Sequence, residues 1–535
     1  MNLFGAILLL SVVSASASTE SELLFEDMTA RADLTPHLTN WSLAHAAAWG
    51  DVNGDGRPDL YIGAFADRPE YGAPNAPIPN QLFIQTGEGF TLSNEQAIRF
   101  EGKRARSTSA IFVDLDNDGD LDLLVGNNGP KVSQVQCTLF ENDGHGGFHD
   151  VTPSTTPWPR PLAVRNVSAW DIDGDGLLDL IFTDGNYANW DNGGGRVIAL
   201  RNKGGWAFED VSEKFGFPSK GTAGMGLAVG DVNDDGTLDF FVADCNRLFV
   251  SGPQSRYSEC RTTPFAKPVG DPKSHACGAA FGDLNGDGLL DLVTTEHGQP
   301  ANLHVYLNRG IQKGMPTFEP ITGKAGLDAK FPKIGTTGVP VKTAHVSLQD
   351  FDNDGRIDIM LTVPYRDDRN RLQPVVLKNL GNTAEGVPRF SPPPMDRLCG
   401  YYAPGPVADY DRDGRLDLFL PAWFTNTPSV LFRNISSGNG HWLTVRVVGK
   451  AKPFNAAGIG STVRLYAAGH LGDPRHLLAR RDIVIGAGYS SGEETTAHAG
   501  LGPVTLCDLE VTWGGKVVTQ KNVSADQRVT LVFEP

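Results

Sequence analysis

The sequence predicts an all-β protein, built as a seven-bladed β-propeller followed by a small β-rich C-terminal domain. Three observations support this fold class. An acidic nine-residue motif, Asp-x-Asp/Asn-x-Asp-Gly-x-x-Asp, occurs seven times at a spacing of about 60 residues, which is typical of a repeat fold. Each repeat divides into short strands of the number and length found in propeller blades. The 62 glycines and 35 prolines favour turn-rich β-structure over helix.

The seven motifs are here called acidic loops one to seven, and they are Asp51–Asp59, Asp114–Asp122, Asp171–Asp179, Asp231–Asp239, Asp283–Asp291, Asp350–Asp358 and Asp409–Asp417. Each loop runs into an apolar stretch of strand length. The third repeat is expected to form strands at Asn166–Trp170, Leu178–Thr183, Val197–Arg201 and Phe208–Ser212. Four antiparallel strands per repeat predict one propeller blade.

The two ends of the repeat array fit a closed ring. Leu24–Thr29 has the sequence of a fourth strand but precedes the first acidic loop. The seventh repeat has a third strand at Val430–Arg433 and then departs from the pattern near Gly438. We therefore expect the N-terminal strand to complete the seventh blade, which would leave no exposed sheet edge at the seam.

Each acidic loop offers oxygen ligands at positions 1, 3, 5 and 9, a backbone carbonyl at position 7, and a glycine at position 6 that permits a sharp turn. Calcium takes six to eight oxygen ligands and suits this spacing better than magnesium, which keeps several waters. An EF-hand is excluded because position 12 is never a glutamate. The alternative is that the Asp-Gly pairs only form turns, but seven metal-free loops would accumulate unscreened charge.

The sequence thus predicts about seven structural calcium sites, which would bring the formal net charge of −17 close to zero. Loops with asparagine at position 3 carry one charge fewer and are expected to bind most weakly. The predicted metal ligands are Asp51, Asn53, Asp55, Arg57 and Asp59; Asp114, Asp116, Asp118, Asp120 and Asp122; Asp171, Asp173, Asp175, Leu177 and Asp179; Asp231, Asn233, Asp235, Thr237 and Asp239; Asp283, Asn285, Asp287, Leu289 and Asp291; Asp350, Asp352, Asp354, Arg356 and Asp358; Asp409, Asp411, Asp413, Arg415 and Asp417.

Targeting signals predict a secreted protein. Residues 1–18 contain an apolar run followed by Ala15-Ser-Ala17, the pattern of a signal peptide. No later stretch reaches 18 apolar residues, so no membrane insertion is expected. The expected domains are the propeller at 19–437 and the β domain at 438–535. The acidic balance argues against nucleic acid as a partner.

Cysteines and glycosylation sequons fit the secretory route. The chain has six cysteines, an even number, and Cys245–Cys260 is the first candidate for a disulfide because both fall within one repeat. The alternative is that some are buried free thiols. Four Asn-x-Ser sequons predict a glycoprotein, and they begin at Asn40, Asn166, Asn434 and Asn522.

The acidic motif resembles the FG-GAP/VCBS repeats of integrin α-chain propellers and their secreted relatives. The C-terminal stretches His441–Arg446, Gly458–Gly460, Arg481–Tyr489, His498–Gly502 and Val511–Trp513 resemble the ASPIC/UnbV module. The two together resemble the cartilage acidic protein family over nearly the whole mature chain. The resemblance implies a secreted, calcium-binding, glycosylated protein of the extracellular matrix or cell surface, with a role in cell adhesion. Longer vertebrate members carry an EGF-like segment after the module, so partner preferences that depend on that segment are not carried over.

Two functional classes remain open from the residues themselves. The first is a binding protein that recognises a protein or glycan ligand with the face of the ring opposite the acidic loops, through Ala64–Asn80 and Gly323–Thr343. The second is a propeller enzyme, a glycan lyase or hydrolase. The 12 histidines are scattered, and neither His275 near Cys277 nor the isolated His297 has a metal-ligand spacing. Gly488–Gly492 matches the G-x-S-x-G of hydrolases without the helix that should follow it. We therefore expect no catalytic residues.

Overall fold

The computed structural model describes most of the chain. The described residues are 23–38, 43–65, 79–99, 106–128, 137–154, 158, 163–185, 195–222, 224–261, 265, 276–298, 301–424, 427–438 and 440–535. The predicted signal peptide and the sequon at Asn40 lie outside them. Within these residues the protein is all-β, because every helix is four residues or shorter. These helices are α1 (Thr35–Leu38), α2 (Gln96–Arg99), α3 (Ser212–Phe215), η4 (Pro253–Ser255) and η5 (Pro474–His476).

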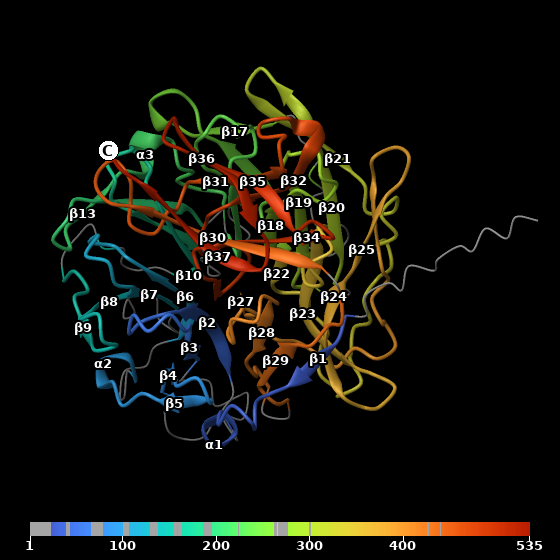
Figure 1. Cartoon of the computed structure of the whole chain (residues 1–535). Coiled ribbons are helices and arrows are strands. Elements are labelled where there is room, and N and C mark those ends of the chain that lie inside the picture. The colour runs from blue at the N-terminus through green and yellow to red at the C-terminus, as the bar shows by residue number, and fades with distance from the viewer. Residues whose placement is uncertain are drawn as a thin grey trace, which may run out of the picture.

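Each acidic loop belongs to one antiparallel sheet of its own (Figure 1). In repeats one to four the strands are β2 (Ala44–Gly50), β3 (Asp59–Ala64), β4 (Gln81–Gln85) and β5 (Phe90–Leu92); β6 (Ser107–Val113), β7 (Asp122–Asn127), β8 (Thr138–Asn142) and β9 (Phe148–Asp150); β10 (Val164–Trp170), β11 (Asp179–Asp184), β12 (Val197–Asn202) and β13 (Phe208–Asp210); β14 (Leu227–Gly230), β15 (Asp239–Val242), β16 (Arg247–Val250) and β17 (Ser258–Cys260). The strands of each repeat pair in sequence order, as expected for consecutive hairpins.

The remaining repeats follow the same plan with two variations. Their strands are β18 (Ala276–Gly282), β19 (Asp291–Glu296), β20 (Leu303–Gln312) and β21 (Met315–Pro320); β22 (Val346–Gln349), β23 (Asp358–Arg366) and β24 (Leu372–Leu377), followed by the separate hairpin β25 (Asn379–Asn382) and β26 (Pro388–Phe390); β27 (Val407–Ala408), β28 (Asp417–Leu420), β29 (Val430–Asn434) and β1 (Phe25–Asp27). In all seven repeats the acidic loop joins the first strand to the second, and its position-9 aspartate begins the second strand.

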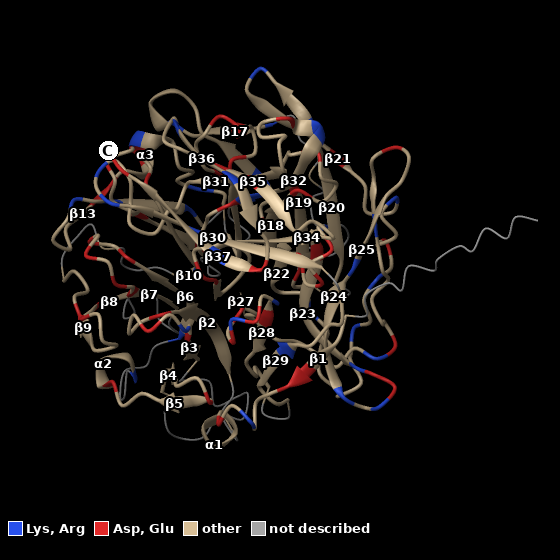
Figure 2. Cartoon of the chain, in the orientation of Figure 1, with Lys and Arg blue, Asp and Glu red and all other residues tan. Residues whose placement is uncertain are grey.

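The N-terminal strand β1 adds the fourth strand to repeat seven, as the sequence predicts. It pairs antiparallel with β29, with Phe25 opposite Asn434 and Glu26 opposite Arg433. Figure 2 shows the acidic β1 beside the basic end of β29. Residues separated by about 400 positions therefore share one sheet. Among the described residues, none of the sheets closes on itself.

First strands lie toward the middle of the molecule and fourth strands at its periphery (Figure 1). Contacts join β2 to β6, β6 to β10, β14 to β18 and β18 to β22. Every residue of β2, β6 and β10 is buried. These strands are buried on both faces because a neighbouring sheet packs on each side, so they lack the polar and apolar alternation of a half-exposed strand.

The C-terminal region, residues 440–535, forms two further sheets. One contains β34 (Ala497–Gly502), β30 (His441–Gly449) and β37 (Gln527–Phe533), and the other β32 (Leu477–Asp482), β31 (Thr462–Ala467), β35 (Leu506–Trp513) and β36 (Lys516–Ser524). The short strand β33 (Ser491–Gly492) leaves these sheets and pairs parallel with β2 of repeat one. Backbone pairing therefore joins the C-terminal region to the repeats. The sequence leaves open whether this region packs on the repeats or hangs free.

The predicted Cys245–Cys260 disulfide does not form, and none of the six cysteines, all of which the structure describes, is disulfide-bonded. Cys260 ends β17 opposite Leu248 and packs in the cluster between repeats four and five. Cys245 contacts a different cluster, the one shared with repeat three. The two side chains thus point to opposite faces of one sheet, where they cannot be bridged without moving the backbone.

Two of the predicted glycosylation sites are buried. The Asn166 and Asn434 side chains are fully enclosed and hydrogen-bonded, Asn166 to the Gly486 carbonyl and Asn434 to the Phe351 carbonyl. Neither could carry a glycan in this fold, because glycosylation requires a surface position. Asn522 is exposed, so the prediction of a glycan remains open there.

Candidate metal sites of the acidic loops

All seven acidic loops share one pattern of backbone hydrogen bonds. In loop two the Gly119 N–H donates to Asp114 Oδ2 over 3.0 Å, and the Asp120 N–H donates to Asp118 Oδ1 over 3.2 Å. The same bonds, from position 6 to position 1 and from position 7 to position 5, recur in the other six loops. The chain is therefore already wound around the position-1 and position-5 carboxylates by its own N–H groups.

Position 4 of each acidic loop requires a left-handed backbone conformation, which the sequence analysis did not predict. The backbone is left-handed at both position 4 and position 6, for example at Asn117 (φ 61°) and Gly119 (φ 104°) in loop two. Position 4 is left-handed in all seven loops, at Gly54, Asn117, Gly174, Asp234, Gly286, Asn353 and Arg412. Glycine, asparagine and aspartate tolerate this conformation best. Their recurrence at position 4 is the sequence signal that could have found it.

The position-9 aspartates have a structural role beyond the one predicted. In loop two, Asp122 Oδ2 accepts the Leu115 N–H of its own loop over 3.0 Å, and Oδ1 accepts the Asn142 N–H of the third strand over 3.1 Å. All seven repeats contain both bonds. Each position-9 carboxylate thus ties its acidic loop to the third strand with or without a metal.

Four of the loops gather three carboxylates around one point. In loops two, three, six and seven, oxygens of positions 1, 3 and 9 lie within 4.8 Å of one another. In loops one, four and five the position-3 asparagine instead donates its amide N–H to the position-5 carboxylate, over 3.3, 2.9 and 2.9 Å. The structure therefore separates the seven predicted sites into two groups by the residue at position 3.

The electrostatics of the loops favour a bound cation. Burial, together with neighbouring carboxylates, raises the pKa of Asp114 to about 7, that of Asp122 to about 8 and that of Asp350 to about 8. The same causes raise the pKa of Asp239, Asp291, Asp358 and Asp417 well above the ordinary value. Carboxylates in this condition must either bind protons or share a positive ion.

Several oxygens of the loops are buried without a hydrogen-bond partner among the described residues. They include Asp114 Oδ1, Asp120 Oδ1, Asp173 Oδ1, Asn233 Oδ1 and Asp409 Oδ1. Buried polar atoms are almost always partnered in folded proteins, so a cluster of exceptions needs a cause. An all-oxygen donor set of this kind fits a hard divalent cation. Several of the acidic loops could therefore bind a metal ion.

In three of the loops, a basic side chain on or next to the third strand pairs with the position-3 aspartate. On the third strand of repeat three, Arg201 Nε lies 2.7 Å from Asp173 Oδ2. In repeat six Lys378 Nζ lies 2.6 Å from Asp352 Oδ2, and in repeat seven Arg433 Nε lies 2.5 Å from Asp411 Oδ2. The position-7 arginines also pair with their own position-5 carboxylates, as Arg57 does with Asp55 over 2.5 Å. These side chains neutralise part of the charge that a metal would otherwise neutralise.

The C-terminal region covers the face that carries the acidic loops. The Ala456 N–H donates to Asn117 Oδ1 of loop two over 3.0 Å, and Arg480 Nη2 donates to the Asp231 carbonyl of loop four over 2.7 Å. His498 Nε2 lies 2.9 Å from Asn353 Oδ1 of loop six. Arg412 of loop seven forms a two-bonded ion pair with Glu494. The loops are therefore the surface on which the C-terminal region rests.

From that face, residues 485–494 enter the middle of the molecule, and we call them the central segment. Asn166 and Ser168 of repeat three donate to the Gly486 and Ile485 carbonyls. The Gly488 N–H donates to the Leu227 carbonyl of repeat four and to the Ala279 carbonyl of repeat five. The segment is thus held by the backbone and side chains of several first strands at once.

The rest of the central segment bonds to the remaining repeats. The Tyr489 N–H donates to His345 Nδ1 of repeat six over 2.9 Å, and the Gly405 N–H of repeat seven donates to Ser491 Oγ over 2.9 Å. β33 pairs with β2 of repeat one and contacts β6 of repeat two. Every repeat therefore contacts this one segment.

The G-x-S-x-G match lies within the central segment. Ser490 has no exposed surface, and its Oγ lies 3.3 Å from His45 Nδ1. His45 Nδ1 also lies 3.2 Å from the Thr108 carbonyl, and His45 Nε2 lies 3.1 Å from the Tyr489 hydroxyl. The motif thus lies in a turn packed into the middle of the molecule, with its serine buried.

Family models match both parts of the chain. The FG-GAP-like repeat model matches residues 51–125, 171–242, 283–361 and 350–420, together more than half of the chain, and the model for ASPIC and UnbV matches residues 451–534. The protein therefore belongs to the FG-GAP-like repeat proteins, and it carries an ASPIC/UnbV module after the repeats.

Among curated proteins, the chain is similar to cartilage acidic protein 1. It is 28% identical to the *Mus musculus* protein over 466 residues, which cover 82% of this chain and 66% of that protein. It is 26% identical to the *Xenopus tropicalis* protein over 508 residues, covering 89% and 71% respectively. The match spans slightly less than two thirds of the mouse and human proteins. The predicted resemblance to the cartilage acidic protein family is confirmed.

Solved structures resemble the chain only distantly. Rhamnogalacturonan lyase YesW aligns with a TM-score of 0.38 at 14% identity, covering 73% of this chain and 71% of that one. The *V. cholerae* biofilm matrix protein Bap1 aligns with a TM-score of 0.29 at 12% identity, covering 91% and 68%. Scores this low support no argument about function. No helix within the described residues is long and apolar enough to cross a membrane.

Proposed function

We propose that this protein is a secreted, calcium-binding interaction protein of the extracellular matrix or cell surface. In this proposal the acidic loops bind about seven calcium ions, which stiffen a closed seven-bladed propeller at residues 19–437, and residues 438–535 form a separate β domain docked upon it. The observation that carries the proposal is the set of buried side-chain oxygens without partners among the described residues, which occupy positions 1, 3 or 7 of loops two, three, four and seven. The similarity to cartilage acidic protein 1 and the predicted signal peptide support an extracellular location.

A recurring hydrogen bond supports closure of the ring. A side-chain amide at the end of the third strand donates to the position-2 carbonyl of the preceding acidic loop, as Asn142 does to Val52 over 2.9 Å. The same bond follows in repeats three, five, six and seven. In repeat one the donor is Gln85, and the acceptor is the Tyr410 carbonyl of repeat seven, at 3.0 Å. Repeat one thus makes with repeat seven the bond that the other repeats make with the repeat before them.

The C-terminal region covers the acidic-loop face, so a ligand surface is expected on the opposite face of the repeats. The connection Gly323–Thr343 lies between β21 and β22, and Ile334 within it is 54% exposed. The connection Ala64–Asn80 lies mostly outside the described residues. We propose that a protein or glycan partner binds on this second face, where a rigid scaffold would hold the recognition loops.

The alternative of a glycan lyase or hydrolase has less support. An active site in the middle of a propeller needs an open channel, whereas the central segment fills the middle of the described residues with buried groups such as Tyr489 and Ser490. The low-scoring likeness to rhamnogalacturonan lyase YesW does not change this balance.

Calcium counting combined with thermal unfolding tests the proposal. Extracellular sites typically bind calcium with Kd values of about 10⁻⁴–10⁻³ M, so about 1 mM calcium would contribute roughly 0.4–1.4 kcal/mol per occupied site. We expect several bound calcium ions by elemental analysis and a Tm several degrees lower in excess chelator. A protein that binds no calcium and melts at the same temperature in chelator would refute the proposal.

A further inference from the structure

A turn in the C-terminal region winds with a period of three residues. The His470 N–H donates to the Ala467 carbonyl over 3.0 Å, and the Asp473 N–H donates to the His470 carbonyl over 3.0 Å. The His476 N–H then donates to the Asp473 carbonyl over 2.9 Å. These bonds close three separate turns, in which Gly469 and Gly472 adopt the left-handed conformation (φ 83° and 78°), and the turns bring His470, Asp473 and His476 close together. The spacing His-x-x-Asp-x-x-His therefore places three potential metal ligands on one side of the turn.

The turn is anchored at both ends. It joins β31 to β32, which pair with each other along most of their length. The Gly469 N–H donates to Asp508 Oδ2 on the neighbouring strand over 2.9 Å. Asp473 also accepts the Arg475 N–H and so begins the short helix η5. The backbone that carries the three ligands is thus fixed by hydrogen bonds other than those among their side chains.

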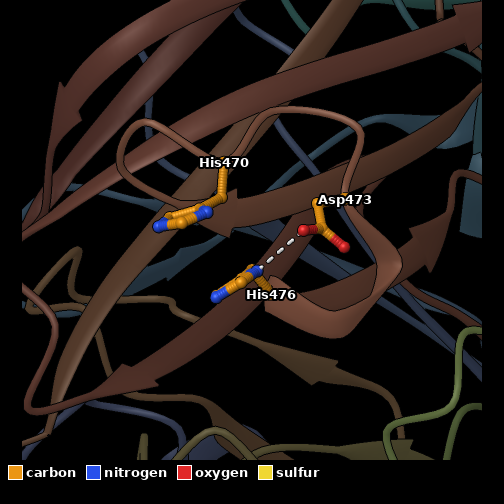
Figure 3. A group of neighbouring side chains, drawn as sticks. All are labelled: His470, Asp473 and His476. Carbon is orange, nitrogen blue, oxygen red and sulfur yellow. Dashed lines mark hydrogen bonds and ion pairs between the residues drawn. The ribbon is translucent and has the colours of Figure 1, made fainter.

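The three side chains converge (Figure 3). The imidazole rings of His470 and His476 stack at 3.7 Å with an angle of 17°, and His476 Nδ1 lies 3.1 Å from Asp473 Oδ2. One ligand atom from each residue lies within 4.8 Å of the others. His470 is exposed and the other two are half-buried, so solvent reaches the group directly.

We propose that His470, Asp473 and His476 form a zinc site. Two imidazole nitrogens and one carboxylate oxygen are a common three-ligand set for Zn²⁺, with water in the fourth position. Imidazole ligands favour zinc and other transition metals over calcium, which takes oxygen ligands. The site is independent of the calcium proposal, because it lies on the C-terminal region and has a different ligand chemistry.

Arg475 is the group that competes with the metal. Its Nη2 lies 2.7 Å from Asp473 Oδ2, and its side chain is 82% exposed. The pair is bidentate, because Arg475 Nε also donates to Asp473 Oδ1 over 3.0 Å, but it is exposed to solvent, where ion pairs contribute little. A divalent metal bound by two imidazoles can therefore displace it. The arrangement also supplies a variant that should improve the site, because Arg475→Gln frees the Asp473 carboxylate for the metal.

Zinc binding by the whole chain tests the inference. Zinc chloride is titrated calorimetrically in buffer that contains excess calcium, which occupies the oxygen-only sites. We expect one zinc equivalent in the wild-type chain and in the His149→Gln control, which changes an exposed histidine on β9. The His470→Gln/His476→Gln double variant should lose this zinc equivalent, because only the Asp473 carboxylate of the three ligands remains.

Two further measurements make the result decisive. Unfolding in zinc-free buffer should give the same Tm for the wild type and the double variant, because the turn is anchored by backbone bonds. Arg475→Gln should bind zinc more tightly than the wild type. Equal zinc binding by the wild type and the double variant would overturn the inference, as would a wild-type chain that takes up no zinc.

Discussion

Acidic loops two and six have aspartate at the same four positions but differ in the side chain that faces them. In loop six, Lys378 Nζ lies 2.6 Å from Asp352 Oδ2 and 3.8 Å from Asp354 Oδ2. The equivalent third-strand residue of repeat two is Glu141, whose charge helps to raise the pKa of Asp116. One loop thus contains its own cation and the other contains an additional acid. The number of carboxylates alone therefore does not rank these loops as metal sites.

The difference extends around the repeats. Loops three and seven resemble loop six, with Arg201 and Arg433 beside the position-3 aspartate. Loops one, four and five have asparagine at position 3, and the equivalent third-strand residues are the apolar Ile84, Val250 and Leu307. Among the described residues, aspartate at position 3 is thus paired with a base in loops three, six and seven but not in loop two. We infer that loop two binds calcium most tightly, and that the asparagine loops compete on equal terms with loops three, six and seven.

The largest expected effect on the free energy of unfolding comes from the position-9 aspartate, which all seven loops share. Asp122→Ala in loop two and Asp358→Ala in loop six each leave two backbone N–H groups without their acceptor. Each variant should lose about 2–5 kcal/mol of unfolding free energy, because buried donors would be left unsatisfied. Denaturant unfolding in chelator measures this. A loss seen only with calcium present would show that position 9 acts solely as a metal ligand.

A pH series gives the next largest effect. Folding raises the pKa of Asp59 and Asp409 to about 7 and that of Asp179 to about 8. A group with a raised folded pKa contributes stability that is present at low pH and lost as pH rises through that pKa. The metal-free protein should therefore lose several degrees of Tm between about pH 6 and pH 8.

Calcium should remove this dependence, because it neutralises the ionised carboxylates. The buried His345 acts in the opposite direction, because burial lowers its pKa from 6.5 to about 4. It destabilises the fold only as pH falls through about 6.5 toward 4, so it offsets part of the aspartate effect near pH 6 and none of it above pH 7. Differential scanning calorimetry with calcium and with chelator provides both curves. A metal-free Tm that rises with pH would contradict the prediction.

A reciprocal pair of charge changes sharpens the comparison directly. Glu141→Lys gives loop two the cation of loop six and should weaken its calcium affinity by about tenfold, or about 1.4 kcal/mol. Lys378→Leu gives loop six the apolar neighbour of loop five and should strengthen its calcium affinity by a similar factor. Isothermal titration calorimetry measures both, with the exposed Glu534→Lys as the control for net charge. Equal affinities in all four proteins would break the comparison.

The smallest expected effect comes from position 3 itself. Asn53→Asp in loop one adds a carboxylate beside the apolar Ile84 and so reproduces part of loop two. Its calcium affinity should rise a few-fold, while the metal-free protein should lose about 0.5 kcal/mol through repulsion from Asp55. Asp116→Asn in loop two should change both quantities in the opposite direction. Affinities that move the same way in both variants would refute the role of charge at position 3.

Much of the repeat architecture could be predicted from local patterns. Each acidic loop and the apolar strand after it fit within a window of about 15 residues, and each second strand begins directly at position 9. The N-terminal strand could be assigned to repeat seven because its sequence resembles the ends of other repeats. The recurrence of glycine, asparagine and aspartate at position 4 also indicates the left-handed backbone there, although only the glycine at position 6 was interpreted as a requirement of the turn.

Other features depended on which residues meet in space. The Cys245–Cys260 pairing was wrong because the two thiols lie on opposite faces of one sheet. Asn166 matches a sequon, yet its side chain bonds to the central segment some 320 residues away. The pairing of Lys378 with Asp352 joins positions whose relation is invisible without the register of the third strand. Sequence spacing carries no record of such distant contacts.

The sequence by itself therefore determined the all-β class, the sevenfold acidic loops and the hard-cation chemistry of their oxygens, because these follow from periodicity and residue type within short windows. The tertiary structure alone decided that the C-terminal region rests on the acidic-loop face and sends residues 485–494 through the middle of the repeats. It also decided which loops contain a cation of their own. These outcomes depend on packing between elements far apart in the chain, where burial and register select the partners of each charged group.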